Sequence, residues 1–232
     1  MCQNVSVSSI KHNRNRLRRL YLPTDFRRSA AAAAADRCKT RWYHFSVKRA
    51  GYVLVGGRSS RMGCDKALLP FHGRALAQVV ARHVAQAAGS AVLVGARERY
   101  RGLGYPLIPD DFPGEGPLGG ILTALRHTAA EWNLVAACDM PGLASGFLED
   151  LLAAAEVNQA STVPMGPSGR LEPLCAVWRR DSLGHLENAF TGGIRKVASA
   201  CEGLRMAIYP VAEVALFQNV NTPKDWAGHV AK

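Results

Sequence analysis

The sequence contains no uncharged apolar run of about 18 residues, which is the length that a membrane-spanning helix needs. Its six cysteines are scattered, without a Cys-x-x-Cys pair, and its seven histidines are equally dispersed. These absences argue against a disulfide framework and against a zinc site. We therefore expect a cytoplasmic protein in a reducing setting, without a membrane partner.

The glycine-rich segment 54–69, LVGGRSSRMGCDKALL, lacks both of the common phosphate-loop patterns. The P-loop pattern Gly-x-x-x-x-Gly-Lys-Ser/Thr fails because Gly63 is followed by cysteine. The dinucleotide pattern Gly-x-Gly-x-x-Gly fails because Gly56 and Gly57 are adjacent. Neither a P-loop NTPase nor a dinucleotide-dependent dehydrogenase is therefore supported.

Acidic residues are scarce near the amino terminus, so the net charge of +11 is unevenly spread. Residues 1–49 hold 12 of the 29 Lys and Arg but only two of the 18 acids, whereas residues 50–232 are close to neutral. This argues against nucleic acid as a partner of the globular part. We interpret 1–49 as a basic, disordered extension that cannot bury enough apolar surface to fold. This interpretation includes a start codon placed too early. A transit peptide and a basic arm for nucleic acid or a membrane surface are the alternatives.

Beyond residue 49, short apolar runs alternate with helical patterns. Strands are expected at 50–55, 91–94, 105–108 and 134–137, and helices at 74–88, 118–128 and 147–156. This alternation predicts one α/β domain, residues 50–232, with a three-layer, mostly parallel Rossmann-like sheet. A strand pair is expected around 162–164 and 174–178, and a final helix is expected to begin at Thr222.

Segment 54–69 follows the first expected strand, at the sheet edge where open α/β folds bind ligands. Glycines there let backbone N–H groups approach a phosphate closely, and Lys66 adds a positive charge. The nearby Arg58, Ser59 and Arg61 favour an anion site over an ordinary glycine-rich turn.

Aspartates follow two later strands. Asp139 comes just after the expected strand 134–137, and carboxylates of this kind bind Mg²⁺ together with substrate phosphates. A helix cap is the alternative role for Asp139. Asp110 begins the loop 110–120, whose glycines and prolines permit close approach to a base or ribose, or form an ordinary loop.

Together these motifs resemble those of the nucleotidyltransferases that build the dinucleotide form of the molybdenum cofactor. Segment 54–69 is most similar to the pattern L-A-G-G-x-S-x-R-M-G-x-D-K of molybdenum cofactor guanylyltransferases. Asp65 favours that branch over the cytidylyltransferases, which usually carry proline before the lysine. Four further motifs follow in order, and the match covers roughly residues 51–230: Asp110 with Gly116-Pro117-Leu118-x-Gly120, Cys138-Asp139-Met140-Pro141, Gly193-x-Arg195-Lys196-Val197 and Asn219-Val220-Asn221-Thr222-Pro223.

The resemblance implies transfer of GMP from GTP to the terminal phosphate of molybdopterin, with Mg²⁺ as cofactor and release of pyrophosphate. Lys66 and Arg61 would bind the phosphates, Asp110 would contact the nucleotide, and Asp139 would bind both Mg²⁺ and nucleotide. GTP and molybdopterin are thus the implied partners, together with molybdoenzymes or their chaperones. The guanine and ribose side of GTP would lie against four residues at the end of the first strand: Leu54, Val55, Gly56 and Gly57.

Acceptor binding is implied for two further pairs of residues. Arg195 and Lys196 follow a glycine pair and would hold the molybdopterin phosphate, with a solvated basic pair as the alternative. Asn219 and Asn221 would hydrogen-bond the pterin, with turn and capping roles as the alternative. The chain departs from the family where valine replaces alanine at 55, and where 94–96 lacks the asparagine that often follows the second strand.

Three other functions compete with guanylyl transfer. One is a cytidylyltransferase, or another small-phosphate nucleotidyltransferase, of the same fold. Another is a non-catalytic adaptor that binds molybdopterin or a molybdoenzyme. The third is a basic nucleic-acid binder. The presence of both Lys66 and Asp139 argues against the adaptor, because an adaptor needs neither a phosphate-binding cation nor a metal-binding acid.

Overall fold

The computed structural model describes residues 48–56 and 64–220, together with Thr222, Asp225 and Trp226. These residues belong to the compact unit His44–Lys232. Within them, no helix combines the length and the apolar character needed to cross a membrane. Several predictions concern residues outside the described part of the chain: the extension 1–49 up to residue 47, and Gly57, Arg58, Ser59, Arg61 and Asn221.

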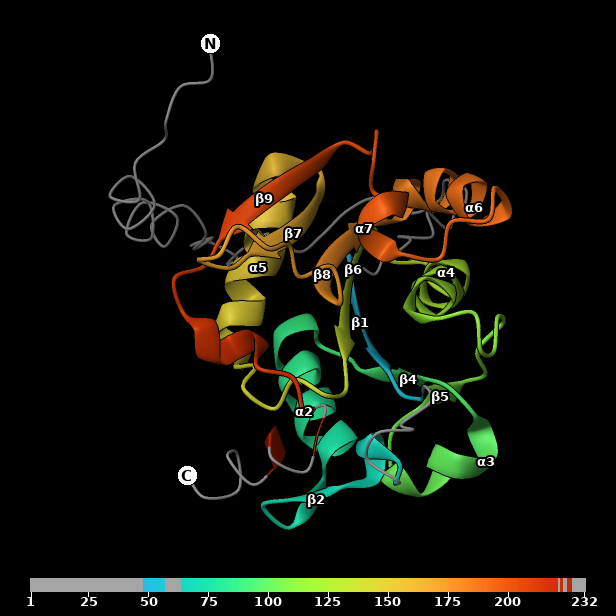
Figure 1. Ribbon diagram of the computed structural model, residues 1–232, viewed down its shortest axis with the longest axis vertical. Helices are drawn as coiled ribbons and strands as arrows, with labels where there is room; N and C mark the ends of the chain where they lie inside the picture. The colour runs from blue at the N-terminus through green and yellow to red at the C-terminus, as the bar shows by residue number, and fades with distance from the viewer. Residues whose placement is uncertain (1–47, 57–63, 221, 223–224, 227–232) are drawn as a thin grey trace, which may run out of the picture. The chain divides into compact units, whose positions relative to one another are not determined.

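A seven-stranded sheet forms the centre of the fold, with the strand order β5-β4-β1-β6-β8-β7-β9 (Figure 1). Six strands run in one direction, because β5, β4, β1 and β6 are parallel neighbours and β7 is parallel to β9. Only β8 is reversed among the strands of this sheet in the described residues, since it pairs antiparallel with both β6 and β7. The bounds are β1 Arg49–Leu54, β4 Val92–Val94, β5 Leu107–Ile108, β6 Trp132–Ala137, β7 Ser161–Met165, β8 Cys175–Arg179 and β9 Met206–Pro210.

Helices cover both faces of the sheet, which confirms the predicted three-layer architecture. Helices α2 (Leu76–Ala88) and α5 (Ser145–Asn158) pack on one face, against Val53 and Leu134. Helices α4 (Pro117–Arg126), α6 (Leu183–Thr191) and α7 (Val197–Ala200) pack on the other, against Tyr52 and Val135. Successive residues of a strand thus face opposite layers, and both faces are apolar, as expected for parallel strands covered on both sides.

The close packing of α2 on β1 depends on Gly51. A Cβ atom at this position would lie 2.3 Å from the carbonyl oxygen of Ser90 and 2.4 Å from a methyl group of Val84. Only glycine therefore lets the helix lie this near to the central strand.

The expected elements are present, and their ends shift by at most two residues. The predicted strand pair is β7 and β8, which the turn 166–169 helps to reverse through a hydrogen bond of 2.9 Å from Gly169 N to Gly166 O. A hairpin of two short strands, β2 (Pro70–Phe71) and β3 (Arg74–Ala75), was not predicted. Strands of two residues are too short to show an alternation of apolar and polar residues. The hairpin delays the start of α2 to Leu76.

The first strand begins one residue earlier than predicted, at Arg49. The Nε and Nη2 atoms of Arg49 each donate a hydrogen bond of 2.7 Å to the carboxylate of Glu156 on α5. The backbone carbonyl of Lys48 also accepts a hydrogen bond of 2.9 Å from Trp132 N. Arg49 therefore belongs to the sheet rather than to the basic extension, where its charge had placed it.

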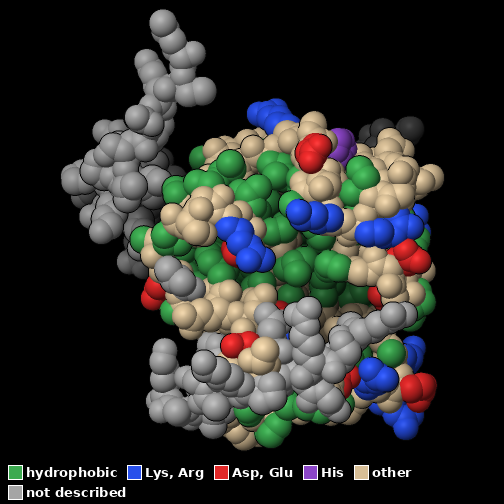
Figure 2. All heavy atoms as spheres, in the orientation of Figure 1, with side chains coloured by type: hydrophobic (Ala, Val, Ile, Leu, Met, Phe, Trp, Pro, Cys, Tyr) green, Lys and Arg blue, Asp and Glu red, His purple; other side chains and the backbone are tan. Residues whose placement is uncertain are grey.

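Charged side chains of both signs are interspersed on the face of the described residues in Figure 2. This distribution agrees with the near-neutral composition of residues 50–232.

Short segments complete the chain between these elements. They are α3 Arg97–Tyr100 and the 3₁₀ turns η1 Lys66–Leu68, η2 Arg101–Leu103, η3 Arg180–Ser182 and η4 Val214–Phe217.

Candidate functional site

A cavity of about 540 Å³ lies at the carboxyl ends of β1, β4 and β6. The chain passes from β1 to β4 on one side and places β6 on the other, so the cavity is at a switch point of the sheet. This is the edge at which the sequence predicted ligand binding. Six of the predicted site residues line it: Leu54, Val55, Gly56, Lys66, Asp110 and Asp139.

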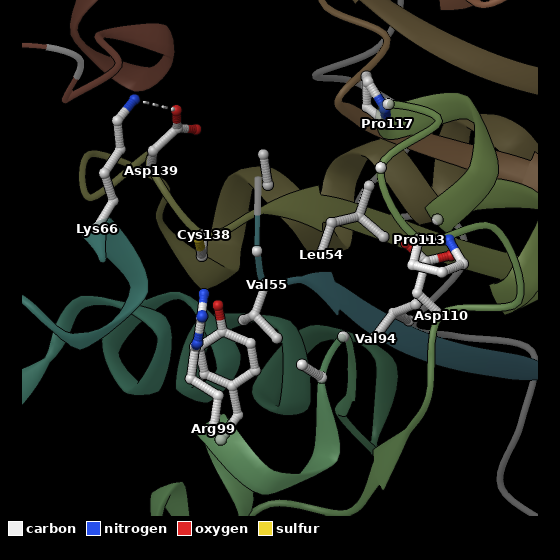
Figure 3. Close-up of a pocket in the computed structure, with 18 of the residues that line it drawn as sticks. Leu54, Val55, Lys66, Val94, Arg99, Asp110, Pro113, Pro117, Cys138 and Asp139 are labelled. Atoms are coloured by element: carbon white, nitrogen blue, oxygen red, sulfur yellow. Dashed lines mark hydrogen bonds and ion pairs between the residues drawn. The ribbon is translucent and has the colours of Figure 1, made fainter. Parts of the chain in front are cut away.

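The charged centre of the cavity is a pair formed by Lys66 and Asp139. Lys66 begins the turn η1, and Asp139 follows β6, separated from it by Cys138. The Nζ atom of Lys66 lies 3.5 Å from Oδ2 of Asp139, and both side chains are 19% exposed (Figure 3). The structure therefore brings together two predicted residues that are 73 positions apart in the sequence.

Asp139 has an electrostatic environment that suits a bound cation. Burial raises the pKa of its carboxyl group, and the positive charge of Lys66 offsets part of this rise. Its second oxygen, Oδ1, is buried and makes no hydrogen bond to any described residue. Buried acceptors are usually paired, so this oxygen is available to a ligand, a metal ion or water. No cluster of three His, Cys, Asp or Glu in the described residues could hold a metal by itself.

Cys138, next to Asp139, also lines the cavity. Burial, and then the negative charges of Asp139 and Asp65, raise the pKa of its thiol to about 12. A thiol with this pKa remains protonated at neutral pH and is a poor nucleophile. Cys138 is therefore a packing residue rather than a nucleophile.

The turn that carries Lys66 is fixed by contacts that no sequence motif indicates. Asp65 precedes this turn, and its Oδ1 atom accepts a hydrogen bond of 3.0 Å from Ala67 N. Its other oxygen, Oδ2, accepts one of 2.7 Å from the hydroxyl of Tyr100, and Arg99 Nη1 lies 3.4 Å away. Burial and the neighbouring Asp65 raise the pKa of Tyr100, so this hydroxyl remains a donor. Helix α3 spans only four residues, and no sequence period could have revealed the contact.

Asp110 lines the opposite side of the cavity and organises the loop that leads into α4. Its Oδ1 atom accepts a hydrogen bond of 2.9 Å from Phe112 N and lies 3.2 Å from the hydroxyl of Thr123. Gly116 then adopts a φ of +87°, and Pro117 occupies the first turn of α4. Asp110 therefore shapes the cavity wall as well as facing the cavity.

Comparison with known proteins identifies the family of this chain. Residues 51–205 match the family described as the MobA-like NTP transferase domain. The chain belongs to this family. The resemblance inferred from the motifs is thereby confirmed, and the protein is a member of a nucleotidyltransferase family.

Individual relatives of this MobA-like transferase agree with the family match. A probable molybdenum cofactor guanylyltransferase of Deinococcus radiodurans is 33% identical over 75% of this chain and 90% of its own length. A molybdenum cofactor guanylyltransferase of Xanthomonas euvesicatoria is 35% identical over 76% of this chain and 92% of its own. The crystal structure of molybdopterin-guanine dinucleotide biosynthesis protein A from Archaeoglobus fulgidus superimposes with a TM-score of 0.68. It is 30% identical and covers 78% of this chain and 96% of that one.

Two residues of this transferase that were predicted to bind the acceptor, Arg195 and Lys196, do not line the cavity. The Nε atom of Arg195 donates a hydrogen bond of 2.5 Å to Glu115, and its guanidinium lies 3.9 Å from the ring centre of Phe190. Glu115 lies between Gly114 and Gly116, which do line the cavity. Arg195 therefore braces the loop 110–116 that leads into α4, whereas Lys196 is exposed at the start of α7.

The segment of the transferase that includes Asn219 lies beside Asp139, although Asn219 does not line the cavity. The Oδ1 atom of Asn219 is buried and makes no hydrogen bond to a described residue. Beyond it, Thr222 and Asp225 exchange hydrogen bonds of 2.8 and 3.2 Å, which confirms the predicted cap at Thr222.

Proposed function

We propose that this protein transfers GMP from GTP to the terminal phosphate of molybdopterin, releasing pyrophosphate and forming the guanine dinucleotide cofactor. Membership of the MobA-like family supports nucleotidyl transfer, and the guanylyltransferase relatives support this choice of substrates. The observation that carries the proposal is the Lys66–Asp139 pair in a cavity at the switch point of the sheet.

The reaction needs positioning and charge neutralisation rather than a strong base. An oxygen of the molybdopterin phosphate forms a bond to the α-phosphorus of GTP, while the bond from that phosphorus to the β-bridging oxygen breaks. Both electrons of the broken bond leave with pyrophosphate. A phosphate is already an anionic nucleophile, so the protein's task is to align the groups and offset negative charge. Lys66 is placed to offset charge on the phosphates and the leaving pyrophosphate.

Mg²⁺ is the metal we propose for this site. The buried, unpaired Oδ1 of Asp139 fits a cation, and Mg²⁺ commonly takes one or two protein carboxylates together with substrate phosphates and water. When bound, the ion would neutralise charge on the phosphate oxygens. Asp139 would hold it, and Lys66 would stay beside the carboxylate to neutralise the remaining negative charge.

The nucleoside of GTP would occupy the side of the cavity near Asp110. There Leu54 ends β1, Val55 and Gly56 follow it, and the loop leading to α4 forms the facing wall. Gly120 of α4 packs closely against Leu54, because a Cβ at Gly120 would lie 3.0 Å from a methyl group of Leu54. The roles of Gly57, Arg61 and Asn221 remain predictions, as do a cytoplasmic location and delivery of the product to molybdoenzymes or their chaperones.

The proposed function can be tested by incubating the full chain with GTP, Mg²⁺ and molybdate-loaded molybdopterin. Mass analysis should detect the guanine dinucleotide, and pyrophosphate should be released in equal amount. Parallel incubations with CTP, UTP and ATP test the choice of base, and a clear preference for CTP would reject guanylyl transfer. Omission of molybdopterin controls for hydrolysis of GTP.

Two variants complete this test. Asp139→Asn and Lys66→Ala should each lower turnover by roughly a hundredfold or more, as expected when one charge-stabilising contact is lost. Unchanged pyrophosphate release in Asp139→Asn would contradict the metal-binding role of this residue.

A further inference from the structure

Arg99 is a cationic residue of the cavity that none of the sequence motifs singled out. It lies on α3, lines the cavity and has a side chain that is 58% exposed. Figure 3 shows Arg99 on the same side of Val55 as Lys66 and Asp139, whereas Asp110 lies on the other side. Arg99 therefore lies in the half of the cavity that contains Lys66 and Asp139.

The contact between Arg99 and Asp65 ties it to the turn that carries Lys66. Arg99 Nη1 lies 3.4 Å from Oδ2 of Asp65, the residue directly before Lys66. The same oxygen accepts the shorter hydrogen bond from Tyr100, which is 1% exposed and holds α3 in place. Because this contact of Arg99 is long and its side chain is exposed, most of its five N–H donors remain accessible to a ligand.

Among the described residues, few positively charged groups line this cavity. Lys66 and Arg99 are the only Lys or Arg among the described residues that line it, and Lys66 is already close to Asp139. A nucleoside triphosphate carries several negative charges on adjacent phosphates. The flat, forked guanidinium of arginine matches two phosphate oxygens at once, which a lysine ammonium cannot do.

We propose that Arg99 is a second phosphate-binding residue for the nucleoside triphosphate, held near Lys66 by its contact with Asp65. The inference rests on the proposed function, in which a triphosphate occupies this cavity. Arg99 binds phosphate oxygens and does not read the base. Its contribution to affinity therefore grows with the number of phosphates on the nucleotide.

Equilibrium binding to the full chain, with Mg²⁺ and competition against labelled GTP, tests the role of Arg99. Arg99→Ala should weaken binding of GTP by about tenfold or more, the usual effect of losing charge-assisted hydrogen bonds. Its affinity for GMP should fall much less, and the ratio of GTP to ATP affinities should stay unchanged. Arg99→Lys should restore part of the loss, because it keeps the charge without the fork.

Arg101→Ala is the matched control for this experiment. Arg101 follows α3, carries the same charge and pairs with Glu98, but it does not line the cavity. We expect its GTP affinity to stay within about twofold of the unchanged protein, since exposed ion pairs contribute little. Thermal melting of each variant checks that the fold is retained.

Three results would overturn the role of Arg99: an equal loss for GTP and GMP, a changed ratio of GTP to ATP, or no loss in Arg99→Ala. If the unchanged protein binds GTP and Arg99→Ala binds it equally well, this inference fails while the proposed function stands. If the unchanged protein binds no nucleoside triphosphate, both fail together.

Discussion

The backbone N–H of Val220 donates a hydrogen bond of 2.9 Å to the backbone carbonyl of Asp139. Val220 is fully buried and packs in a small cluster with Phe71 and Leu76. The hydrogen bond joins the C-terminal segment to the strand end that carries the candidate metal ligand. It brings Asn219 beside Asp139, although the two residues are distant in the sequence.

Asn219→Ala should therefore affect the acceptor rather than the fold. We expect a higher KM for molybdopterin and little change in the KM for GTP. Because the Oδ1 atom of Asn219 is buried without a partner, its loss should cost little stability. Steady-state kinetics with each substrate varied in turn measures the two effects. Val220→Ala is the contrasting variant, and it should lose about 2 kcal/mol of stability through the cavity it creates.

The raised pKa of Asp139 predicts how stability depends on pH. A carboxyl group whose pKa is higher in the folded than in the unfolded protein stabilises the fold below the unfolded pKa. This contribution is lost as the pH rises through the folded pKa. In the absence of metal, Asp139→Asn should therefore gain stability relative to the unchanged protein as the pH rises from about 4 toward neutrality. Thermal melting across this range measures the difference, and parallel curves would contradict it.

Removal of Lys66 should shift this pH dependence upward. The charge of Lys66 lowers the pKa of Asp139, so Lys66→Ala should raise that pKa further. A titration of the Asp139 carboxyl group by NMR, in both proteins, measures the shift directly. An unchanged pKa of Asp139 in Lys66→Ala would show that the two side chains do not interact in solution.

Gly95 should resist substitution because it lies directly beside the residue that follows β1. A Cβ at Gly95 would lie 2.2 Å from the carbonyl oxygen of Val55, which lines the cavity. Gly95→Ala should lose about 1–3 kcal/mol of stability and should also bind GTP more weakly, since Val55 must move. Urea unfolding and GTP binding measure the two effects. Gly102→Ala is the control, because a Cβ there meets nothing within 4 Å.

Tyr100→Phe should weaken the support of the turn that carries Lys66. The change deletes the hydrogen bond of 2.7 Å to Asp65 and leaves the ring in place. We expect a loss of about 1–2 kcal/mol of stability together with slower turnover. Tyr105→Phe serves as the control, since the hydroxyl of Tyr105 makes no hydrogen bond to a described residue. Equal effects of the two changes would show that the bond to Asp65 has no special role.

The ion pair of Arg195 and Glu115 separates two roles for Arg195. If Arg195 braces the loop 110–116, Glu115→Gln should raise the KM for GTP and leave the KM for molybdopterin unchanged. Arg195→Ala should do the same, and it should raise the acceptor KM only if Arg195 also binds the acceptor phosphate. Because both side chains are about half exposed, a double-mutant cycle should give a coupling of only about 0.2–1 kcal/mol. Lys196→Ala controls for the loss of charge.

The sequence allowed prediction of those parts of the fold and site that depend on local order. Alternating apolar and helical patterns predict the sheet, and Lys66 and Asp139 follow directly from parallel strands whose ends share one edge. The strand pair expected around 162–164 and 174–178 is present as β7 and β8. These features need only neighbouring residues and general rules of topology.

Other features depend on contacts between distant residues and left no local signal. Tyr100 meets Asp65 across 35 positions, and Arg195 meets Glu115 across 80. Neither spacing has a period, and an arginine in a basic motif looks the same whether it binds a substrate or an internal glutamate. For the same reason the charge of Arg49 suggested a place in the extension, while its partner Glu156 holds it in the sheet.

The position of Arg49 sets a limit on how far the amino terminus can be trimmed for biophysical work. A protein shortened to begin at residue 50 would leave the carboxylate of Glu156 without its partner Arg49. It would also lack the Lys48 carbonyl that accepts the hydrogen bond from Trp132 N. Truncations intended for crystallisation or NMR should therefore retain Lys48 and Arg49, even if every earlier residue is discarded.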